Sequence, residues 1–206
     1  HGLIEAPYAR DVWFILHTIA ESASGDNLRL VLAGTEFPGP DGAVNYDSLE
    51  FGPLTGNTGA AGRPVSLVAF NNKIYAFGGE SFQKQGIICE KSGSDLFVMS
   101  ELTFSGTGNS AFKPRVAFSY RNRMVYADFG VGYESYVTMS DDYAPATLIA
   151  NSILASNSKS FIVGRNDSDR VVGGTQIMLD AVGSTPQTAA LVLKQYSGWL
   201  LTGELE

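Results

Sequence analysis

Residues 63–78 read RPVSLVAFNNKIYAFG, and residues 115–130 read RVAFSYRNRMVYADFG. Each stretch begins with an arginine, continues with an apolar segment and a short polar turn, and ends with a second apolar segment and a glycine. Apolar segments rich in β-branched and aromatic residues on both sides of such a turn are typical of a β-hairpin. The two stretches therefore predict an all-β fold built from repeated units.

The repeat extends beyond the hairpins. A Thr-Gly-Asn triplet lies eight residues before each arginine, at 55–57 and at 107–109, so the two copies are 52 residues apart. A weaker third copy places Arg10 just before another apolar segment, 53 residues before Arg63. Several short strands in each period of about 50 residues are typical of a β-propeller blade.

Each copy contains further candidate strands, which we expect at Gly86–Glu90, Leu96–Met99, Ser135–Met139 and Thr147–Ala150. Three blades do not close a ring, because a propeller needs at least about four. We therefore expect the other blades to lie outside this chain, which starts at His1 without a methionine and is interpreted as a piece of a larger protein. The alternative fold is a β-sandwich or barrel whose strands resemble one another by chance.

The pattern changes after residue 153. We predict two domains, with propeller blades over residues 1–153 and a β-rich stalk over residues 154–206. The second part contains short apolar segments separated by polar turns such as Asn166-Asp167 and Gly173-Gly174. Isolated short strands are marginal in water, and three copies wrapped around one axis would stabilise them, which predicts a homotrimer. The alternative is a terminal pair of hairpins packed on the main domain.

The composition argues against several classes of function. The net charge of −7 argues against nucleic-acid binding. One cysteine permits neither a disulfide framework nor a cysteine-based metal site, and two histidines are too few for a metal cluster. No apolar run approaches the roughly 18 residues of a membrane-spanning helix. We therefore expect no metal, no cofactor and no membrane insertion.

The segment NNKIYAFGG at residues 71–79 is similar to a blade strand of kelch-type or sialidase-type propellers, and arginines at the head of successive blades are similar to the carboxylate-binding arginines of sialidases. A propeller followed by a β-rich stalk resembles bacteriophage tailspikes of the endosialidase type. The resemblance implies an extracellular homotrimer on the virion tail that binds and hydrolyses an acidic capsule polysaccharide, similar to polysialic acid, during host attachment. The alternatives are a non-catalytic adhesin that binds carbohydrate and a kelch-like scaffold that binds a protein.

Equivalent positions in successive blades lie at the same end of a propeller. Arg10, Arg63 and Arg115 are therefore predicted to face one central funnel. The planar guanidinium group of arginine donates two parallel hydrogen bonds to a carboxylate, the group that sialic and uronic acids carry. The alternative is that each arginine pairs with a neighbouring acidic side chain.

Catalytic candidates follow from the same resemblance. Sialidase-type enzymes use a tyrosine nucleophile, activated by a nearby glutamate. The endosialidase family has a catalytic glutamate shortly before one of its arginines, and Glu50, 13 residues before Arg63, matches that position best. Tyr133, followed by Glu134, is the second candidate, and the alternative for both is a solvated loop side chain. Arg165 and Arg170 flank a polar turn and are predicted to form a secondary anion site, with a solvated turn as the alternative, and Trp199 is predicted to stack on a sugar face.

Overall fold

The structure is a computed structural model, and it describes residues 2–5, 12–21, 25–34, 47–50, 66–79, 84–92, 96–106, 112–148, 161–164, 167, 169–179 and 187–202. Sixteen β-strands and no α-helix are found in these ranges, so the predicted all-β class is confirmed. The chain divides into two compact units, which we call the N-terminal unit (residues 1–102) and the C-terminal unit (residues 103–206).

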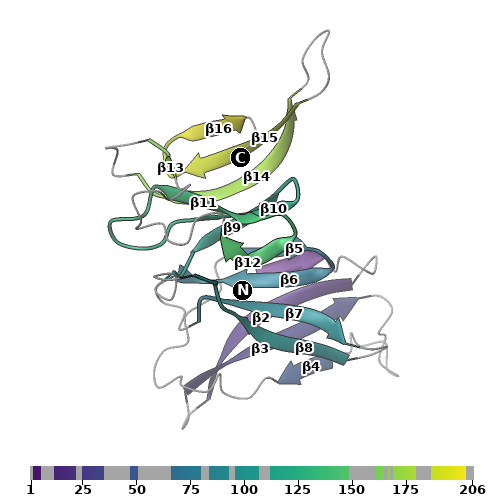
Figure 1. The fold of residues 1–206 in the computed structure, drawn as a ribbon. Helices are drawn as coiled ribbons and strands as arrows, with labels where there is room; N and C mark the ends of the chain where they lie inside the picture. The colour runs from purple at the N-terminus through teal and green to yellow at the C-terminus, as the bar shows by residue number, and fades with distance from the viewer. Residues whose placement is uncertain are drawn as a thin grey trace. The chain divides into compact units, whose positions relative to one another are not determined.

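The N-terminal unit contains two antiparallel sheets of four strands, each arranged in sequence order (Figure 1). The first sheet consists of β1 (Gly2–Glu5), β2 (Val12–Glu21), β3 (Gly25–Gly34) and β4 (Asp47–Glu50). The second consists of β5 (Ser66–Phe70), β6 (Lys73–Phe77), β7 (Gly86–Ser92) and β8 (Leu96–Leu102). Strand β6 is apolar on both faces and is buried from Ile74 to Phe77, as expected for an interior strand.

The C-terminal unit contains a five-stranded sheet and a three-stranded sheet. The larger sheet consists of β9 (Val116–Tyr120), β10 (Arg123–Ala127), β11 (Tyr136–Asp141), β12 (Ala144–Leu148) and β13 (Phe161–Ile162). Strands β12 and β13 pair with opposite ends of the same edge of β11. The smaller sheet consists of β14 (Val171–Leu179), β15 (Gln187–Lys194) and β16 (Gly198–Thr202). Among the described strands, no sheet closes on itself.

The hairpins predicted on either side of residues 71–72 and 121–122 are confirmed. Strands β5 and β6 meet at Asn71 and Asn72, which both have positive φ (49° and 57°), as the tight turns of two-residue hairpins require. Strands β9 and β10 meet at Arg121 and Asn122, and Arg121 also has positive φ (53°). Asparagine tolerates this left-handed conformation better than most residues do, which explains the first turn.

The hairpin turns of the two copies are spaced differently from the arginines and the Thr-Gly-Asn triplets. Strand β9 begins directly after Arg115, whereas β5 begins three residues after Arg63. The two hairpin turns are therefore 50 residues apart rather than 52. Along the sequence, Arg63 precedes the first residue of its turn by eight residues and Arg115 precedes the first residue of its turn by six.

The two sheets of the C-terminal unit pack face to face around one hydrophobic core, and β14 contacts β9 (Figure 1). The five-stranded sheet contributes Val116, Phe118, Tyr120, Val125, Ala127, Val137 and Met139, and the three-stranded sheet contributes Val171, Ala190 and Val192. These residues alternate along their strands, as expected when one face of each sheet is buried. A second group of aromatic rings (Phe104, Phe112, Tyr126 and Phe129) is buried as well.

Gly173 and Gly174 lie within β14, so the prediction of a polar turn at this position is wrong. A bulge lies between Val171 and Gly173, and Gly174 pairs with Val192 of β15. The ring of Phe118, which is 5% exposed, occupies the space that a Cβ atom at Gly174 would need. The glycine pair therefore permits a close approach between the two sheets rather than a reversal of the chain.

The C-terminal segment was predicted to contain short strands, but two of its strands are long. Strand β14 has nine residues and β15 has eight, and both share a core with β9 to β11. The two compact units divide at residue 102, while the predicted division at residue 153 into blades and stalk stays a prediction.

We expect Gly174→Ala to lower the free energy of unfolding by about 1–3 kcal/mol, because the new methyl group overlaps the buried Phe118 ring. The matched control is Gly173→Ala, where an added Cβ meets no atom within 4 Å. For the control we expect a change within about 0.5 kcal/mol. Urea denaturation of both variants measures the difference, and equal stabilities would contradict the proposed close approach of the sheets.

Candidate functional site

The predicted site residues fall into two groups. Arg115, Tyr133, Arg170 and Trp199 are described by the structure and belong to the C-terminal unit. Glu50 is the last residue of β4 and belongs to the N-terminal unit. The catalytic roles predicted for Glu50 and, as the second candidate, for Tyr133 with Glu134 are not tested by this placement and stay predictions.

The other predicted residues, Arg10, Arg63 and Arg165, lie outside the described residues. The predicted funnel of Arg10, Arg63 and Arg115 therefore stays a prediction. The structure does bring Arg115 together with Arg170, which the sequence had suggested only as part of a separate, secondary site.

Arg115 and Arg170 converge on the carboxylate of Asp128, and we call these three residues the arginine–aspartate cluster. Arg170 Nη2 donates a hydrogen bond to Asp128 Oδ1 at 3.2 Å. Arg170 Nε lies 3.2 Å from Asp128 Oδ2, and Arg115 Nη1 lies 3.9 Å from the same oxygen. Asp128 is 1% exposed, whereas about 40% of each arginine side chain remains exposed. The cluster thus has a buried anion beneath two partly exposed cations.

The strand topology explains why these residues meet. Arg115 directly precedes β9 and Asp128 directly follows β10, and these ends are adjacent because Val116 pairs with Ala127. The Arg115 backbone N–H donates to the Asp128 carbonyl oxygen at 2.9 Å, which continues the hairpin by one residue. Arg170 directly precedes β14, which packs against β9. Two sheets therefore supply the cluster.

Asp128 has a backbone conformation that suits a strand end followed by a loop. Its φ is 54°, in the left-handed region that aspartate adopts more readily than most residues. Burial raises the pKa of Asp128 above its ordinary value, although the charges of Arg170 and Arg115 and a backbone hydrogen bond from Gly130 lower it. Burial has the larger effect on this pKa because the loss of hydration disfavours the charged form of the carboxyl group more than the two arginines favour it.

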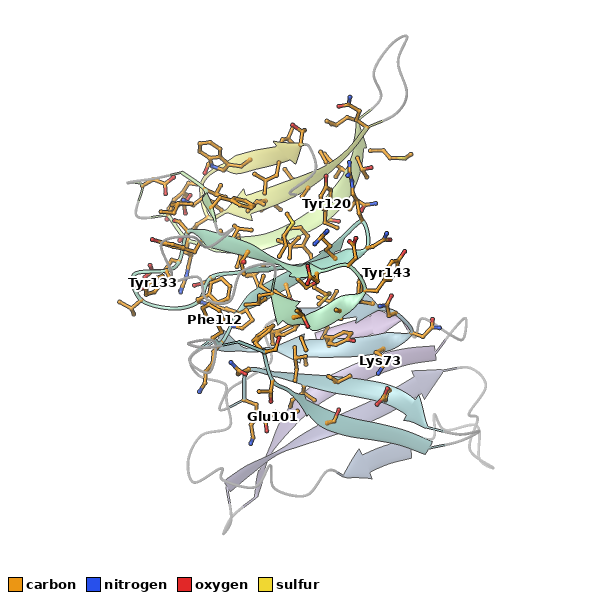
Figure 2. All side chains as sticks on the ribbon, viewed as in Figure 1. Lys73, Glu101, Phe112, Tyr120, Tyr133 and Tyr143 are labelled. Atoms are coloured by element: carbon orange, nitrogen blue, oxygen red, sulfur yellow. The ribbon has the colours of Figure 1, made fainter. Side chains whose placement is uncertain are left out.

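The loop from Asp128 to Tyr136 places two tyrosines near the cluster. Tyr133 N donates to Gly130 O at 2.9 Å, and the Tyr133 and Tyr136 rings pack edge to face with centroids 5.1 Å apart. Figure 2 shows Tyr133 at one end of the C-terminal unit and Tyr143 at the opposite end. Tyr133 is therefore on the same end of the sheet as Asp128.

A buried lysine fixes the neighbouring segments. The Lys194 side chain is 0% exposed, and its Nζ contacts the carboxylate of Asp167. It also donates to Ser135 Oγ and to the Val163 carbonyl oxygen, both at 3.0 Å. Lys194 thus has three acceptors from separate parts of the chain, which compensates the burial of its charge. It holds the loop before β11 and the segment before β14 in fixed positions.

The turn between β15 and β16 is attached to the segment beside the cluster. Asp169 Oδ2 accepts hydrogen bonds from Tyr196 N at 3.0 Å and from Ser197 Oγ at 3.4 Å. Gln195 N donates to the carbonyl oxygen of Arg170 at 3.1 Å. The turn carrying Tyr196, which leads into β16 and Trp199, is therefore held next to the backbone of Arg170.

The sequence matches no known protein-family model, and no curated protein shows significant similarity to it. In the described part of the chain, no group of three or more histidine, cysteine or acidic side chains is arranged to hold a metal ion. The same ranges contain no helix with the length and apolar character needed to cross a membrane.

Asp128 and Lys194 were missed by the sequence analysis. A signal for Asp128 was present, because it stands between the apolar segment MVYA and Phe129-Gly130, where the other copy of the hairpin has no carboxylate. An acidic residue that interrupts an apolar pattern requires a partner if it is buried. Lys194 gave a similar signal at the end of the apolar segment of β15.

We expect Arg170→Ala to raise the pKa of Asp128 further, because the largest of the effects that lower this pKa is lost. Lys73→Ala, which removes an exposed ion pair with Glu90 in the N-terminal unit, is the control and leaves the pKa of Asp128 unchanged. Carboxyl carbon chemical shifts measured against pH by NMR give the value in each variant. A lower pKa in Arg170→Ala would contradict the arrangement of the cluster.

A second prediction concerns stability and pH. A carboxyl group whose pKa is raised by folding binds its proton more tightly in the folded state. The contribution of Asp128 to the free energy of unfolding therefore falls as the pH rises from about 4, the ordinary pKa of aspartate, through the raised value. Asp128→Asn removes this contribution, so we expect the wild type minus variant difference in stability to decrease with pH across that window. Urea denaturation at several pH values measures it, and a difference independent of pH would contradict the raised pKa.

Proposed function

We propose that this chain belongs to an extracellular recognition protein that binds an acidic cell-surface polysaccharide through the arginine–aspartate cluster. The observation that carries the proposal is that Arg115 and Arg170 face one buried carboxylate yet remain about 40% exposed. Among the described residues, Asp128 is the carboxylate that ion-pairs with them, so the trio has one net positive charge in a chain of net charge −7.

The chemistry of arginine supports a carboxylate as the ligand group. A guanidinium group has five N–H donors, and Asp128 takes one hydrogen bond and one ion contact from Arg170 and a longer contact from Arg115. Among the described residues, these two guanidinium groups make no other hydrogen bond, and each side chain is about 40% exposed, so their exposed donors can meet a second carboxylate, such as that of a uronic or sialic acid. Asp128 holds both side chains in place before the ligand arrives, which lowers the entropy lost on binding.

The biological setting belongs to the same proposal. The sheets β1–β4, β5–β8 and the β9–β12 part of the larger sheet are each a four-stranded meander, which is the form of a propeller blade. This supports the proposal that the chain provides blades of a partial propeller in a phage tailspike. A homotrimeric stalk, a place on the virion tail and a role in host attachment are proposed from the resemblance to endosialidase-type tailspikes.

Binding of the polysaccharide is the function that the arginine–aspartate cluster supports. Hydrolysis by a metal-independent, endosialidase-like mechanism is the second candidate, and it is supported by the position of Tyr133 and Glu134 in the loop that follows Asp128. The test is to incubate the chain with polysialic acid and count new reducing ends. Cleavage that is lost in Tyr133→Phe or in Glu50→Gln would show that the protein hydrolyses the polymer as well as binding it. If the polymer stays intact, the proposed function is binding without hydrolysis.

We expect Arg115→Ala and Arg170→Ala each to weaken binding to acidic oligosaccharides by about tenfold or more, because a charge-assisted hydrogen bond contributes about 1.5–3 kcal/mol. Isothermal titration calorimetry with polysialic acid and with oligogalacturonate measures the affinities. Lys73→Ala is the matched control, since it removes the same charge from an exposed ion pair in the other unit. Unchanged affinity in the double arginine variant would refute the proposed function.

A further inference from the structure

The turn between β15 and β16 and the start of β16 each present a large aromatic side chain to solvent. Tyr196 is 83% exposed and Trp199 is 43% exposed. Leaving this much aromatic surface in water gives up the free energy that burial would provide. Exposed aromatic residues on a well-fixed turn are therefore better explained by a binding role than by packing.

The turn is fixed by a set of hydrogen bonds. Lys194 N donates to Ser197 O at 2.8 Å, which closes the turn. Trp199 Nε1 donates to Ser197 Oγ at 3.2 Å, so the indole ring has a defined orientation. Gln195 Nε2 donates to the hydroxyl of Tyr196 at 2.8 Å. Both rings are thus held in place without a ligand, and little conformational entropy would be lost when one binds.

The turn and the arginine–aspartate cluster are joined through two consecutive residues. Asp169 accepts the hydrogen bonds of the turn, and Arg170, the next residue, contacts Asp128. Ser135 Oγ also donates to the Asp169 carbonyl oxygen at 2.9 Å, which ties this segment to the loop that follows Asp128. The backbone of the turn is therefore held beside the backbone of Arg170, and we take an extended ligand to reach both.

We propose that Tyr196 and Trp199 form a stacking subsite for an uncharged sugar unit, and that the ligand is a polysaccharide in which a uronic acid alternates with a neutral sugar. This inference rests on the proposed function, because it takes the cluster to hold the uronic acid carboxylate. The apolar C–H groups on one face of the neutral sugar pack against the aromatic rings.

The carboxylate of Asp169, which is bonded to the turn, favours a neutral sugar unit at the aromatic residues over an acidic one. The Asp169 carboxylate is bonded to the backbone of Tyr196 and to Ser197, and among the described residues it has no ion pair. A sugar carboxylate stacked at this turn would face that negative charge, and two like charges at close range repel. A polymer with a carboxylate on every unit is therefore disfavoured, whereas an alternating polymer satisfies both subsites.

The test compares three oligosaccharides of equal length by calorimetry. Hyaluronan oligosaccharide alternates glucuronate with N-acetylglucosamine, oligogalacturonate carries a carboxylate on every unit, and maltooligosaccharide is neutral. We expect hyaluronan oligosaccharide to bind about tenfold more tightly than oligogalacturonate. Tyr196→Ala, a change at an exposed side chain, lowers the hyaluronan affinity about threefold to tenfold, the range expected for one aromatic contact. Trp199→Phe retains most of the affinity and Trp199→Ala loses it.

The control is Tyr143→Ala, which removes an exposed tyrosine at the opposite end of the unit (Figure 2) and leaves binding unchanged. Equal affinity for hyaluronan and oligogalacturonate, or full affinity in Tyr196→Ala and Trp199→Ala, would refute the stacking subsite. If the arginine variants still lose binding in that case, the proposed function stands and the subsite alone fails. If the arginine variants keep binding, the proposed function fails as well.

Discussion

The close approach of Phe118 to Gly174 sets the distance between the two sheets of the C-terminal unit. The ring fills the space above a residue that has no side chain, so the apolar faces of β9–β11 and β14–β16 meet without a gap. Dense packing of this kind determines the positions of the strand ends as well as their stability. Because Arg115, Asp128 and Arg170 lie at strand ends on both sheets, the geometry of the cluster depends on this packing.

The site uses burial in two different ways. Lys194 is buried with a complete set of acceptors and acts as a fixed internal link. Asp128 is buried with its charge only partly compensated, and the two arginines above it keep contact with water. The first arrangement favours rigidity, whereas the second leaves donors available to a ligand.

Strands and turns could be predicted from the sequence where local pattern determines them. The hairpin at Arg121 and Asn122 was found because alternation and turn residues are local signals. Gly173 and Gly174 were misread because a glycine pair looks the same in a turn and beside a ring from a distant strand. The meeting of Arg115 with Arg170 depends on the stacking of two sheets, which no local pattern reports. Asp128 gave a local signal as an acidic residue within an apolar pattern, but its pairing with Arg170 depends on the same stacking of sheets.

The links made by Lys194 also have a consequence for the order of folding. Its partners Asp167, Val163 and Ser135 precede it by 27, 31 and 59 residues. Contacts between residues far apart in the sequence form late and slow the folding of a domain. During synthesis, the apolar face of β9–β11 stays uncovered until β15 has left the ribosome. Until then this face is open to non-native association, so the C-terminal unit is expected to benefit from a chaperone during synthesis.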